Sequence, residues 1–382
     1  MVPNNNIRIV ADDKIPFLRG ILEPYAKVEY FPGAEIRQDI LKNADALITR
    51  TRTKVSKDLL TGTKVRFVAT ATIGFDHIDT NWLAENNVHW TNAPGCNSNS
   101  VMQYIAASLV FLAREKGFCF KGKTIGIVGV GNVGSKVAKM AEILGFKVLL
   151  NDPPRERLEG KGPFVSLEVI KEKADIITLH VPLNKEGKDK TLGMANTDFF
   201  HSLRKTPILI NSSRGTVVNG EALKTAISTK KVSGAVLDVW NNEPHIDPEL
   251  VAMLDIMTPH IAGYSMDGKA NGTAMSVNAI ADFFDFPLKS WSPENLPEPD
   301  NPVIQINDTD LLEQEVLETA IYHTYPIEKD DNNLRTNLLD FEKLRGNYPV
   351  RREFPAYRIK LKSEDETIYK KLMKLGFKKL LT

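Results

Sequence analysis

The apolar positions of this 382-residue chain fall into short runs that alternate with longer polar and amphipathic segments. In the first hundred residues the runs predict five β-strands with helical segments between them. These strands are Ile7–Ala11, Lys27–Phe31, Ala46–Thr49, Arg66–Ala71 and Val88–Thr91. Because strands alternate with helices, the pattern favours βαβ units and therefore a parallel sheet.

The period changes at Ser98–Glu115, a long apolar segment that predicts a buried helix. Near its start, Ser100 and Gln103 stand three residues apart, a spacing that predicts a capping box. The strand–helix alternation then resumes at Thr124. It predicts six further strands, at Ile125–Val128, Val148–Asn151, Asp175–His180, Ile208–Asn211, Gly234–Val239 and Ile256–Thr258. This second series predicts a doubly wound sheet, and two α/β domains should leave a ligand cleft between them.

The character of the sequence shifts after Phe286, where five prolines between Pro287 and Pro302 predict a linker. Beyond the linker we expect a helix around Asp310–Tyr322, a strand at Tyr357–Leu361 and a final lysine-rich helix. The basic pair Arg351–Arg352 lies between the first of these helices and the strand. The tail is too short for a third doubly wound unit, so we interpret it as an association or lid module.

A glycine-rich turn carries the strongest cofactor signal. Gly129, Gly131 and Gly134 follow the predicted strand at Ile125–Val128 and precede a predicted helix at Ser135–Leu144. This context is the one a dinucleotide fingerprint requires, because the helix start attracts the pyrophosphate. Within this turn, the residues expected to contact the cofactor are Gly129, Gly131, Asn132, Val133 and Gly134.

An acidic residue follows the fingerprint at the expected distance. Asp152 ends the next predicted strand, where a carboxylate can accept hydrogen bonds from ribose hydroxyls and repel a 2′-phosphate. The sequence therefore predicts NAD rather than NADP as cofactor. Arg155 and Arg157 follow closely and weaken that preference.

Three complementary side chains come directly after predicted strands. His260 suits the transfer of an alcohol proton, because the ordinary imidazole pKa lies near neutrality. Glu243 can orient the imidazole, and Arg214 can hold a carboxylate in two-point contact. Since hydride transfer to nicotinamide from a secondary alcohol needs such groups, the chain is expected to oxidise a small 2-hydroxy acid. His77 is the alternative base.

The chain resembles the D-isomer-specific 2-hydroxyacid dehydrogenase family over roughly residues 7–273. The resemblance rests on Ala71–Asp79, the glycine fingerprint, His180–Leu183, Asn211–Gly215, Asp238–Pro244 and Thr258–Gly263. It implies that Arg214, Glu243 and His260 form the catalytic triad. It also implies substrate contacts at Thr51, Thr72 and Tyr264, and NAD contacts at Asp152, Val181, Asp238 and Gly263. Thr51 stands where the family commonly has Ser, and Val181 where it commonly has Thr.

Further residues resemble a branch of that family that acts on a phosphorylated 2-hydroxy acid and dimerises through a C-terminal domain. They are Arg50–Lys54, Ala93–Val101, Asn151–Arg155, Gly263–Lys269 and Tyr348–Phe354. A substrate with both carboxylate and phosphate needs extra positive charge, for which Arg50, Arg52 and Lys54 are candidates. The alternatives are another member such as phosphoglycerate dehydrogenase or hydroxypyruvate reductase, and a non-catalytic NAD-sensing corepressor.

The expected fold class is α/β, with two Rossmann-like doubly wound parallel-sheet domains and a small α+β C-terminal dimerisation domain. We expect a substrate-binding domain at 1–99 and 265–288, an NAD-binding domain at 100–264 and a homodimerisation domain at 289–382. The formal net charge of +1 gives no reason to expect nucleic acid or a membrane surface as partner. Two cysteines supply neither a disulfide framework nor a metal site, which favours a reducing, cytoplasmic location.

Overall fold

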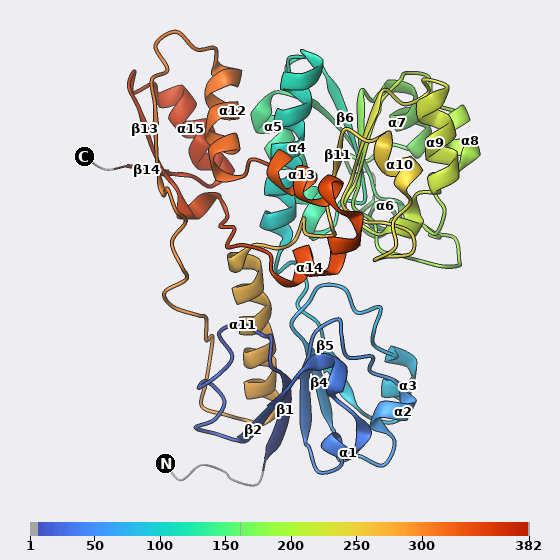
Figure 1. Cartoon of the computed structure of the whole chain (residues 1–382), viewed down its shortest axis with the longest axis vertical. Coiled ribbons are helices and arrows are strands. Elements are labelled where there is room, and N and C mark those ends of the chain that lie inside the picture. Colours follow the sequence, from blue (N-terminus) through green and yellow to red (C-terminus); the bar gives the residue numbers. More distant parts are fainter. Residues whose placement is uncertain (1–6, 161, 381–382) are drawn as a thin grey trace. The chain divides into compact units, whose positions relative to one another are not determined.

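The computed structural model describes residues 7–160 and 162–380. The chain forms two compact units, which contain the strands and helices labelled in Figure 1. One unit consists of the residues up to Asn97 together with Ser265–Pro297. The other consists of Ser98–Tyr264 together with Glu298–Thr382, so the chain leaves this second unit after Tyr264 and returns to it at Glu298.

The first unit contains a five-stranded sheet with the order β2-β1-β3-β4-β5, in which every pair is parallel. The strands are β1 (Arg8–Asp12), β2 (Lys27–Phe31), β3 (Ala46–Thr49), β4 (Phe67–Thr70) and β5 (His89–Thr91). The five predicted strands are thus confirmed. The order reverses between β1 and β3, and ligands favour the carboxyl ends of strands at such a point.

Apolar residues on both faces of this sheet are buried. Ile9 packs in one cluster with Val277 and Ile280, whereas its neighbour Val10 packs in another cluster with Leu41 and Leu83. The period of two along a strand explains why neighbouring residues serve opposite faces. The helices of this unit are η1 (Gly33–Glu35), α1 (Gln38–Leu41), α2 (Lys57–Leu60), α3 (Thr80–Glu85) and α11 (Met266–Phe283).

The second unit contains a six-stranded parallel sheet with the order β11-β10-β9-β8-β6-β7. Its strands are β6 (Thr124–Val128), β7 (Lys147–Asn151), β8 (Ile176–Leu179), β9 (Ile208–Asn211), β10 (Gly234–Leu237) and β11 (Ile256–Met257). The predicted doubly wound sheet is therefore confirmed. Here the order reverses between β6 and β8, so the glycine-rich turn after β6 lies at the point where ligands bind.

Helices cover both faces of the six-stranded sheet. They are α4 (Ser98–Lys116), α5 (Asn132–Leu144), α6 (Pro153–Glu159), α7 (Leu167–Lys173), α8 (Thr197–His201), η2 (Gly215–Val217), α9 (Gly220–Ser228) and α10 (Pro248–Ala252). The predicted capping box at the start of α4 is wrong, because α4 already begins at Ser98. Ser100 Oγ donates to Glu353 Oε1, and Gln103 Nε2 donates to Thr324 Oγ1 and to the Arg352 carbonyl.

The C-terminal residues form a small parallel sheet and several helices that share a core with α4 and α5. The strands are β12 (Val303–Ile306), β13 (Arg358–Leu361) and β14 (Lys378–Lys379). The helices are α12 (Glu313–Thr324), α13 (Glu328–Thr336), η3 (Leu338–Asp340), α14 (Phe341–Gly346), η4 (Phe354–Ala356) and α15 (Glu366–Leu375). Helix α12 packs on α4 and α15 packs on α5, as Figure 1 shows. The α/β fold class is confirmed.

Candidate active site

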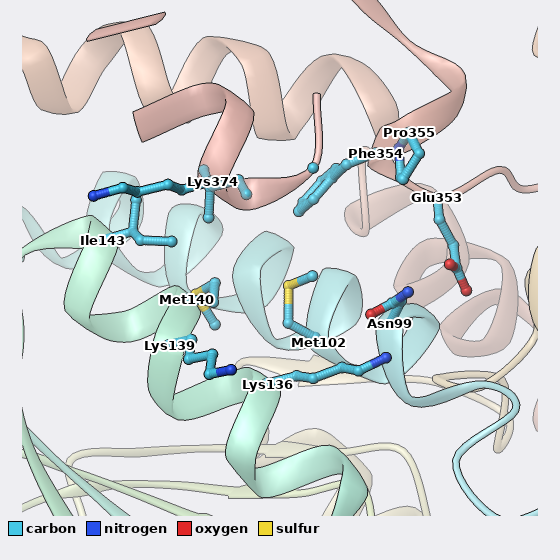
Figure 2. A pocket seen from close by; sticks show the side chains of 12 residues that line it. Asn99, Met102, Lys136, Lys139, Met140, Ile143, Glu353, Phe354, Pro355 and Lys374 are labelled. Carbon is cyan, nitrogen blue, oxygen red and sulfur yellow. The ribbon is translucent and has the colours of Figure 1, made fainter. Parts of the chain in front are cut away.

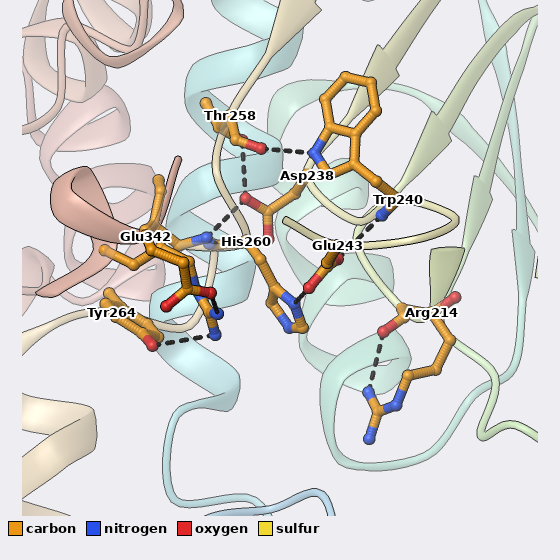
Figure 3. A network of polar contacts seen from close by, with 12 residues as sticks. Arg214, Asp238, Trp240, Glu243, Thr258, His260, Tyr264 and Glu342 are labelled. Carbon is orange, nitrogen blue, oxygen red and sulfur yellow. Dashed lines mark hydrogen bonds and ion pairs between the residues drawn. The ribbon is translucent and has the colours of Figure 1, made fainter. Parts of the chain in front are cut away.

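His260 and Glu243 form a hydrogen-bonded pair at the carboxyl end of the six-stranded sheet (Figure 3). The two side chains follow β11 and β10 respectively, and His260 Nδ1 lies 2.8 Å from Glu243 Oε2. The other carboxylate oxygen of Glu243 accepts a hydrogen bond of 2.9 Å from the Trp240 backbone amide. Since parallel strands end at one edge of the sheet, residues far apart in sequence meet there, as the strand-end argument predicted.

The environment of Glu243 favours the ionised carboxylate. Burial raises its pKa, but the hydrogen bond and charge of His260, the Trp240 amide and the charge of Arg345 together lower it below the ordinary value. An ionised carboxylate can only accept hydrogen bonds, so His260 must carry its proton on Nδ1. The lone pair of a neutral His260 is then on Nε2, which is the arrangement that a general base requires.

A buried network holds the loop that carries His260. His260 has a φ of 57°, in the left-handed region that a histidine adopts at an energetic cost. The Asp238 carboxylate accepts hydrogen bonds from the amides of Ile261, at 2.7 Å, and Ala262, at 2.9 Å. Arg351 donates from Nη2 to the carbonyls of the same two residues, at 3.2 and 2.6 Å. The backbone amides and carbonyls of two consecutive residues are thus all hydrogen-bonded.

Asp238 is expected to contact NAD, but its carboxylate accepts hydrogen bonds from other residues of the protein. The side chain is 1% exposed and also accepts a hydrogen bond of 2.7 Å from Thr258 Oγ1. Burial raises its pKa, while His260, Thr258 and the two loop amides lower it to a smaller extent. The expected contact at Asp238 stays a prediction, as does the one at Gly263, which follows the held peptide units.

Arg214 lies on the neighbouring loop, between β9 and η2. Asn211 stabilises this loop, because its side chain accepts a hydrogen bond from the Ser213 amide and donates one to the Arg214 carbonyl, both at 3.0 Å. A Cβ atom on Gly215 would come within 2.0 Å of the Trp240 carbonyl oxygen, so only glycine lets the two loops pack this closely. The loop of Arg214 therefore lies directly against the loop that leads to Glu243.

The turn after β6 fits a dinucleotide. Gly129 has a φ of 86°, and a Cβ atom on Gly134 would lie 1.9 Å from the Gly129 carbonyl oxygen. A Cβ atom on Gly131 would meet no atom within 4 Å, which leaves room for a phosphate at this position. No side chain of the described residues caps α5 at Gly131, so the first amides of this helix are available to an anion.

Asp152 and the arginines behind it favour NAD. Asp152 Oδ2 accepts a hydrogen bond of 2.8 Å from the Val130 amide, and Oδ1 accepts one of 3.0 Å from the Arg155 amide. Both arginines pair with carboxylates, Arg155 with Glu159 and Arg157 with Asp189. These pairs weaken the case for either guanidinium as a 2′-phosphate ligand. Val181 lies beside the same turn, within 2.9 Å of a Cβ atom built on Gly129.

The expected substrate residues of the first unit follow β3 and β4. Thr51, Arg52 and Lys54 are exposed at the carboxyl end of β3, beside the point where the strand order reverses. Arg50 is half-buried and donates from Nη1 to the Lys14 carbonyl at 3.1 Å. Thr72 Oγ1 donates to the Gly74 carbonyl at 2.9 Å and lies 2.8 Å from Thr70 Oγ1.

His77, the alternative base, lies in the first unit, whereas Arg214, Glu243 and His260 share the second. Its Nε2 atom is 3.2 Å from Thr70 Oγ1, and burial lowers its pKa despite the opposing charge of Asp76. We therefore interpret it as a neutral residue that positions the Thr70 and Thr72 hydroxyls.

Two pockets lie within the second unit. One of about 290 Å³ adjoins the ends of β9 and β10 and is lined by Asn211, Gly215 and Trp240, among others. The other, of about 240 Å³, lies between α4, α5 and the C-terminal residues (Figure 2). Apolar side chains line its floor, and Lys136, Lys139 and Lys374 border it. Arg214, Glu243 and His260 do not line either pocket.

Over residues 7–160 and 162–380, no three His, Cys, Asp or Glu side chains are placed to hold a metal ion. None of the helices described there is long and apolar enough to cross a bilayer. Cys96 is buried and Cys119 is exposed.

The chain is similar to known dehydrogenases over almost its whole length. Residues 109–262 match the NAD-binding domain of the D-isomer-specific 2-hydroxyacid dehydrogenases, and residues 296–376 match a domain of unknown function. Erythronate-4-phosphate dehydrogenase of Bacteroides fragilis is 49% identical over 354 residues, which are 92% of this chain and 99% of that enzyme. The enzyme of the same name from Edwardsiella ictaluri is 40% identical and covers 97% of the chain and 99% of its own length.

Solved structures of related enzymes share the fold. D-lactate dehydrogenase of Aquifex aeolicus, complexed with NAD and lactic acid, superimposes with a TM-score of 0.62 at 25% identity, over 72% of this chain and 95% of that one. The NAD-bound 3-phosphoglycerate dehydrogenase of Entamoeba histolytica gives a TM-score of 0.62 at 24% identity, over 76% of this chain and all of that one.

Proposed function

Because the chain belongs to the erythronate-4-phosphate dehydrogenase family, we propose that it oxidises 4-phospho-D-erythronate to 3-hydroxy-2-oxo-4-phosphobutanoate with NAD. This reaction is a step in the biosynthesis of pyridoxal 5′-phosphate. The relatives' identity over the full length supports this substrate above phosphoglycerate or hydroxypyruvate. The resemblance to a phosphorylated-substrate branch thus agrees with the comparisons.

The hydrogen bond between His260 and Glu243 is the observation that carries the proposed chemistry. His260 Nε2 takes the proton of the C2 hydroxyl, and Glu243 stabilises the imidazolium that results. NAD, when bound, accepts the hydride that leaves C2. Arg214 holds the C1 carboxylate and polarises C2, since its planar guanidinium can bind both carboxylate oxygens.

The cofactor is held by the turn after β6. Gly131 and the amides of Asn132, Val133 and Gly134 accommodate its phosphates, and Asp152 accepts hydrogen bonds from its ribose. Val181, Asp238 and Gly263 complete the proposed cofactor contacts. Thr51, Thr72 and Tyr264 are the proposed substrate contacts, and Arg50, Arg52 and Lys54 are candidates for binding the substrate phosphate.

An absorbance assay tests the proposed function. The purified chain should form NADH from NAD with 4-phosphoerythronate, and 3-phosphoglycerate should give a far lower kcat/KM. A higher kcat/KM with 3-phosphoglycerate would instead support the alternative dehydrogenase. If NADH binds but neither acid is oxidised in the presence of NAD, the non-catalytic sensor becomes the better interpretation.

We further infer a cytoplasmic homodimer that associates through residues 289–382. Exposed apolar side chains of this region support an interface, namely Val303, Leu311, Leu312, Tyr322, Leu339, Val350 and Met373. Leu312→Glu together with Leu339→Glu should therefore convert a dimer into a monomer in light scattering. A wild-type chain that is monomeric at micromolar concentration would contradict this inference.

A further inference from the structure

Arg345, on the short helix α14, has its side chain directed to the residues around His260. Its side chain is 16% exposed, and its guanidinium donates from Nη2 to the Tyr264 phenol oxygen at 3.2 Å. The guanidinium carbon also lies 5.8 Å from the centroid of the Tyr264 ring. Tyr264 follows His260 by four residues, so the C-terminal region places a positive charge beside the candidate active site.

Only some of the hydrogen-bond donors of this guanidinium have partners within the described protein. One carboxylate, that of Glu342, pairs with Nη1 at 3.2 Å, and Glu342 is itself 33% exposed on the same helix. The Nε atom is buried and has no hydrogen-bond partner among the described residues. A buried donor without a partner destabilises a protein unless something else compensates for it.

The charge of Arg345 reaches the catalytic pair. It contributes to the lowered pKa of Glu243, after the larger effects of burial, His260 and the Trp240 amide. In Figure 3, Arg214 lies on one side of His260, whereas Tyr264 and Glu342, the two partners of Arg345, lie on the other. Two guanidinium groups are therefore arranged on either side of the proposed base.

This arrangement matches the distribution of charge in the proposed substrate. The acid carries a carboxylate at C1, the reacting hydroxyl at C2 and a phosphate at C4. With the carboxylate on Arg214 and the hydroxyl at His260, the phosphate extends to the opposite side of the imidazole. A guanidinium suits that place because its planar donors bind phosphate oxygens in pairs.

We propose that Arg345 binds the substrate phosphate and so selects a 4-phosphorylated acid over its unphosphorylated counterpart. This inference rests on the proposed function. Tyr264, which Arg345 already contacts, orients the guanidinium. The C-terminal region thereby contributes a specificity residue to the site formed by the ends of the six-stranded sheet.

Binding of two acids to the NADH-loaded enzyme tests the inference. Calorimetry should show that the wild type binds 4-phosphoerythronate more tightly than erythronate. Arg345→Gln should reduce this preference about tenfold or more, because a charge-assisted contact is lost, whereas Arg345→Lys should retain part of it. Lys343→Gln is the matched control, since it removes one positive charge from an exposed position of the same helix.

Each outcome decides the matter. An unchanged preference in Arg345→Gln, or an equal loss in Lys343→Gln, would overturn the role of Arg345. Equal weakening of both acids would also overturn it, because Arg345 would then act on a part common to both. If Arg345→Gln does not fold, as judged by circular dichroism, Arg345→Lys serves as the test instead. A preference for 4-phosphoerythronate over erythronate equal to that of the wild type would then overturn the role of Arg345. A wild type that neither binds nor oxidises 4-phosphoerythronate would instead refute the proposed function itself.

Discussion

At the scale of single residues, the candidate chemistry depends on one imidazole whose proton position is fixed by a carboxylate. The geometry assigns the Nδ1 proton of His260 to its hydrogen bond with Glu243, which leaves Nε2 as the reactive atom. Neither residue is unusual in the sequence by itself. Their roles follow from the ends of β10 and β11, which bring them together.

Replacement of His260 tests this assignment. His260→Asn should lower kcat by roughly 100-fold or more, the scale of a general acid–base group, while the Kd of NADH stays within a factor of a few. Stopped-flow or steady-state measurement of NADH formation gives kcat. Near-normal turnover would transfer the role of base to another group.

Arg50 and Arg52 provide a second test at this scale. Arg52→Ala or Arg50→Ala should raise the KM for the phosphorylated substrate, because a contact to a charged group contributes about 1.5–3 kcal/mol. The kcat should change less than KM, since neither residue belongs to the proposed proton-transfer pair. Unchanged kinetics in both variants would remove them as phosphate ligands.

The sequence predicted the contact between two strand-end residues, His260 and Glu243, but carried no signal for Arg345. The contact of His260 with Glu243 could be predicted because the carboxyl ends of parallel strands converge. The roles proposed for these two residues and for Arg214 stay predictions. Arg345 stands on a six-residue helix in a charged stretch with no comparable rule. Only the tertiary packing of α14 brings it to Tyr264, and no local signal in the sequence reports that packing.

At the scale of elements, the loop after β11 is held more firmly than its sequence suggests. Asp238 accepts hydrogen bonds from the amides of Ile261 and Ala262, and Arg351 donates hydrogen bonds to their carbonyls. Arg351 is 5% exposed, and its guanidinium also lies 4.4 Å from the centroid of the Tyr325 ring. The C-terminal region thus stabilises the backbone that presents His260.

Removal of Arg351 should therefore affect both stability and turnover. Arg351→Met should destabilise the fold by about 3 kcal/mol, as expected when one member of a buried charged network is removed. It should also lower kcat, because the His260 loop loses its two hydrogen bonds from Arg351. Urea unfolding and steady-state kinetics measure the two effects. If the variant lost the expected stability but its folded fraction kept a normal kcat, the His260 loop would not need the hydrogen bonds of Arg351.

The predicted strands agree with the structure within two residues, whereas several other elements differ. Fully buried strands form continuous apolar runs, which are easy to recognise. The capping box at Ser100 failed because buried partners in the C-terminal region, Glu353 and Thr324, occupy the side chains of Ser100 and Gln103. Helices α13 and α14 were not predicted, because their charged sequences carry little apolar periodicity.

At the scale of the whole molecule, acid should weaken the fold through a half-buried histidine. His180 directly follows β8, its Nε2 atom lies 2.9 Å from Thr178 Oγ1, and burial lowers its pKa from 6.5 to about 3. The folded protein therefore keeps His180 neutral while the unfolded chain takes up a proton below pH 6.5. The stability contributed by neutral His180 is complete above pH 6.5 and declines as the pH falls towards 3.

Comparison of His180→Gln with the wild type isolates this effect. Between pH 7 and pH 5 the wild type should lose about 2 kcal/mol more unfolding free energy than the variant, which has no titrating group at this position. Urea unfolding of the cofactor-free proteins at the two pH values measures the difference. Parallel losses in both proteins would mean that His180 titrates normally in the folded state.

The packing of α12 on α4 has a consequence for biosynthesis. Helix α4 ends at Lys116, and the helix that covers part of its apolar surface begins only at Glu313. A ribosome must therefore translate most of the gene before α4 can bury this surface. Until then the nascent polypeptide exposes the apolar side chains of α4, and chaperones that bind exposed apolar surfaces should associate with it.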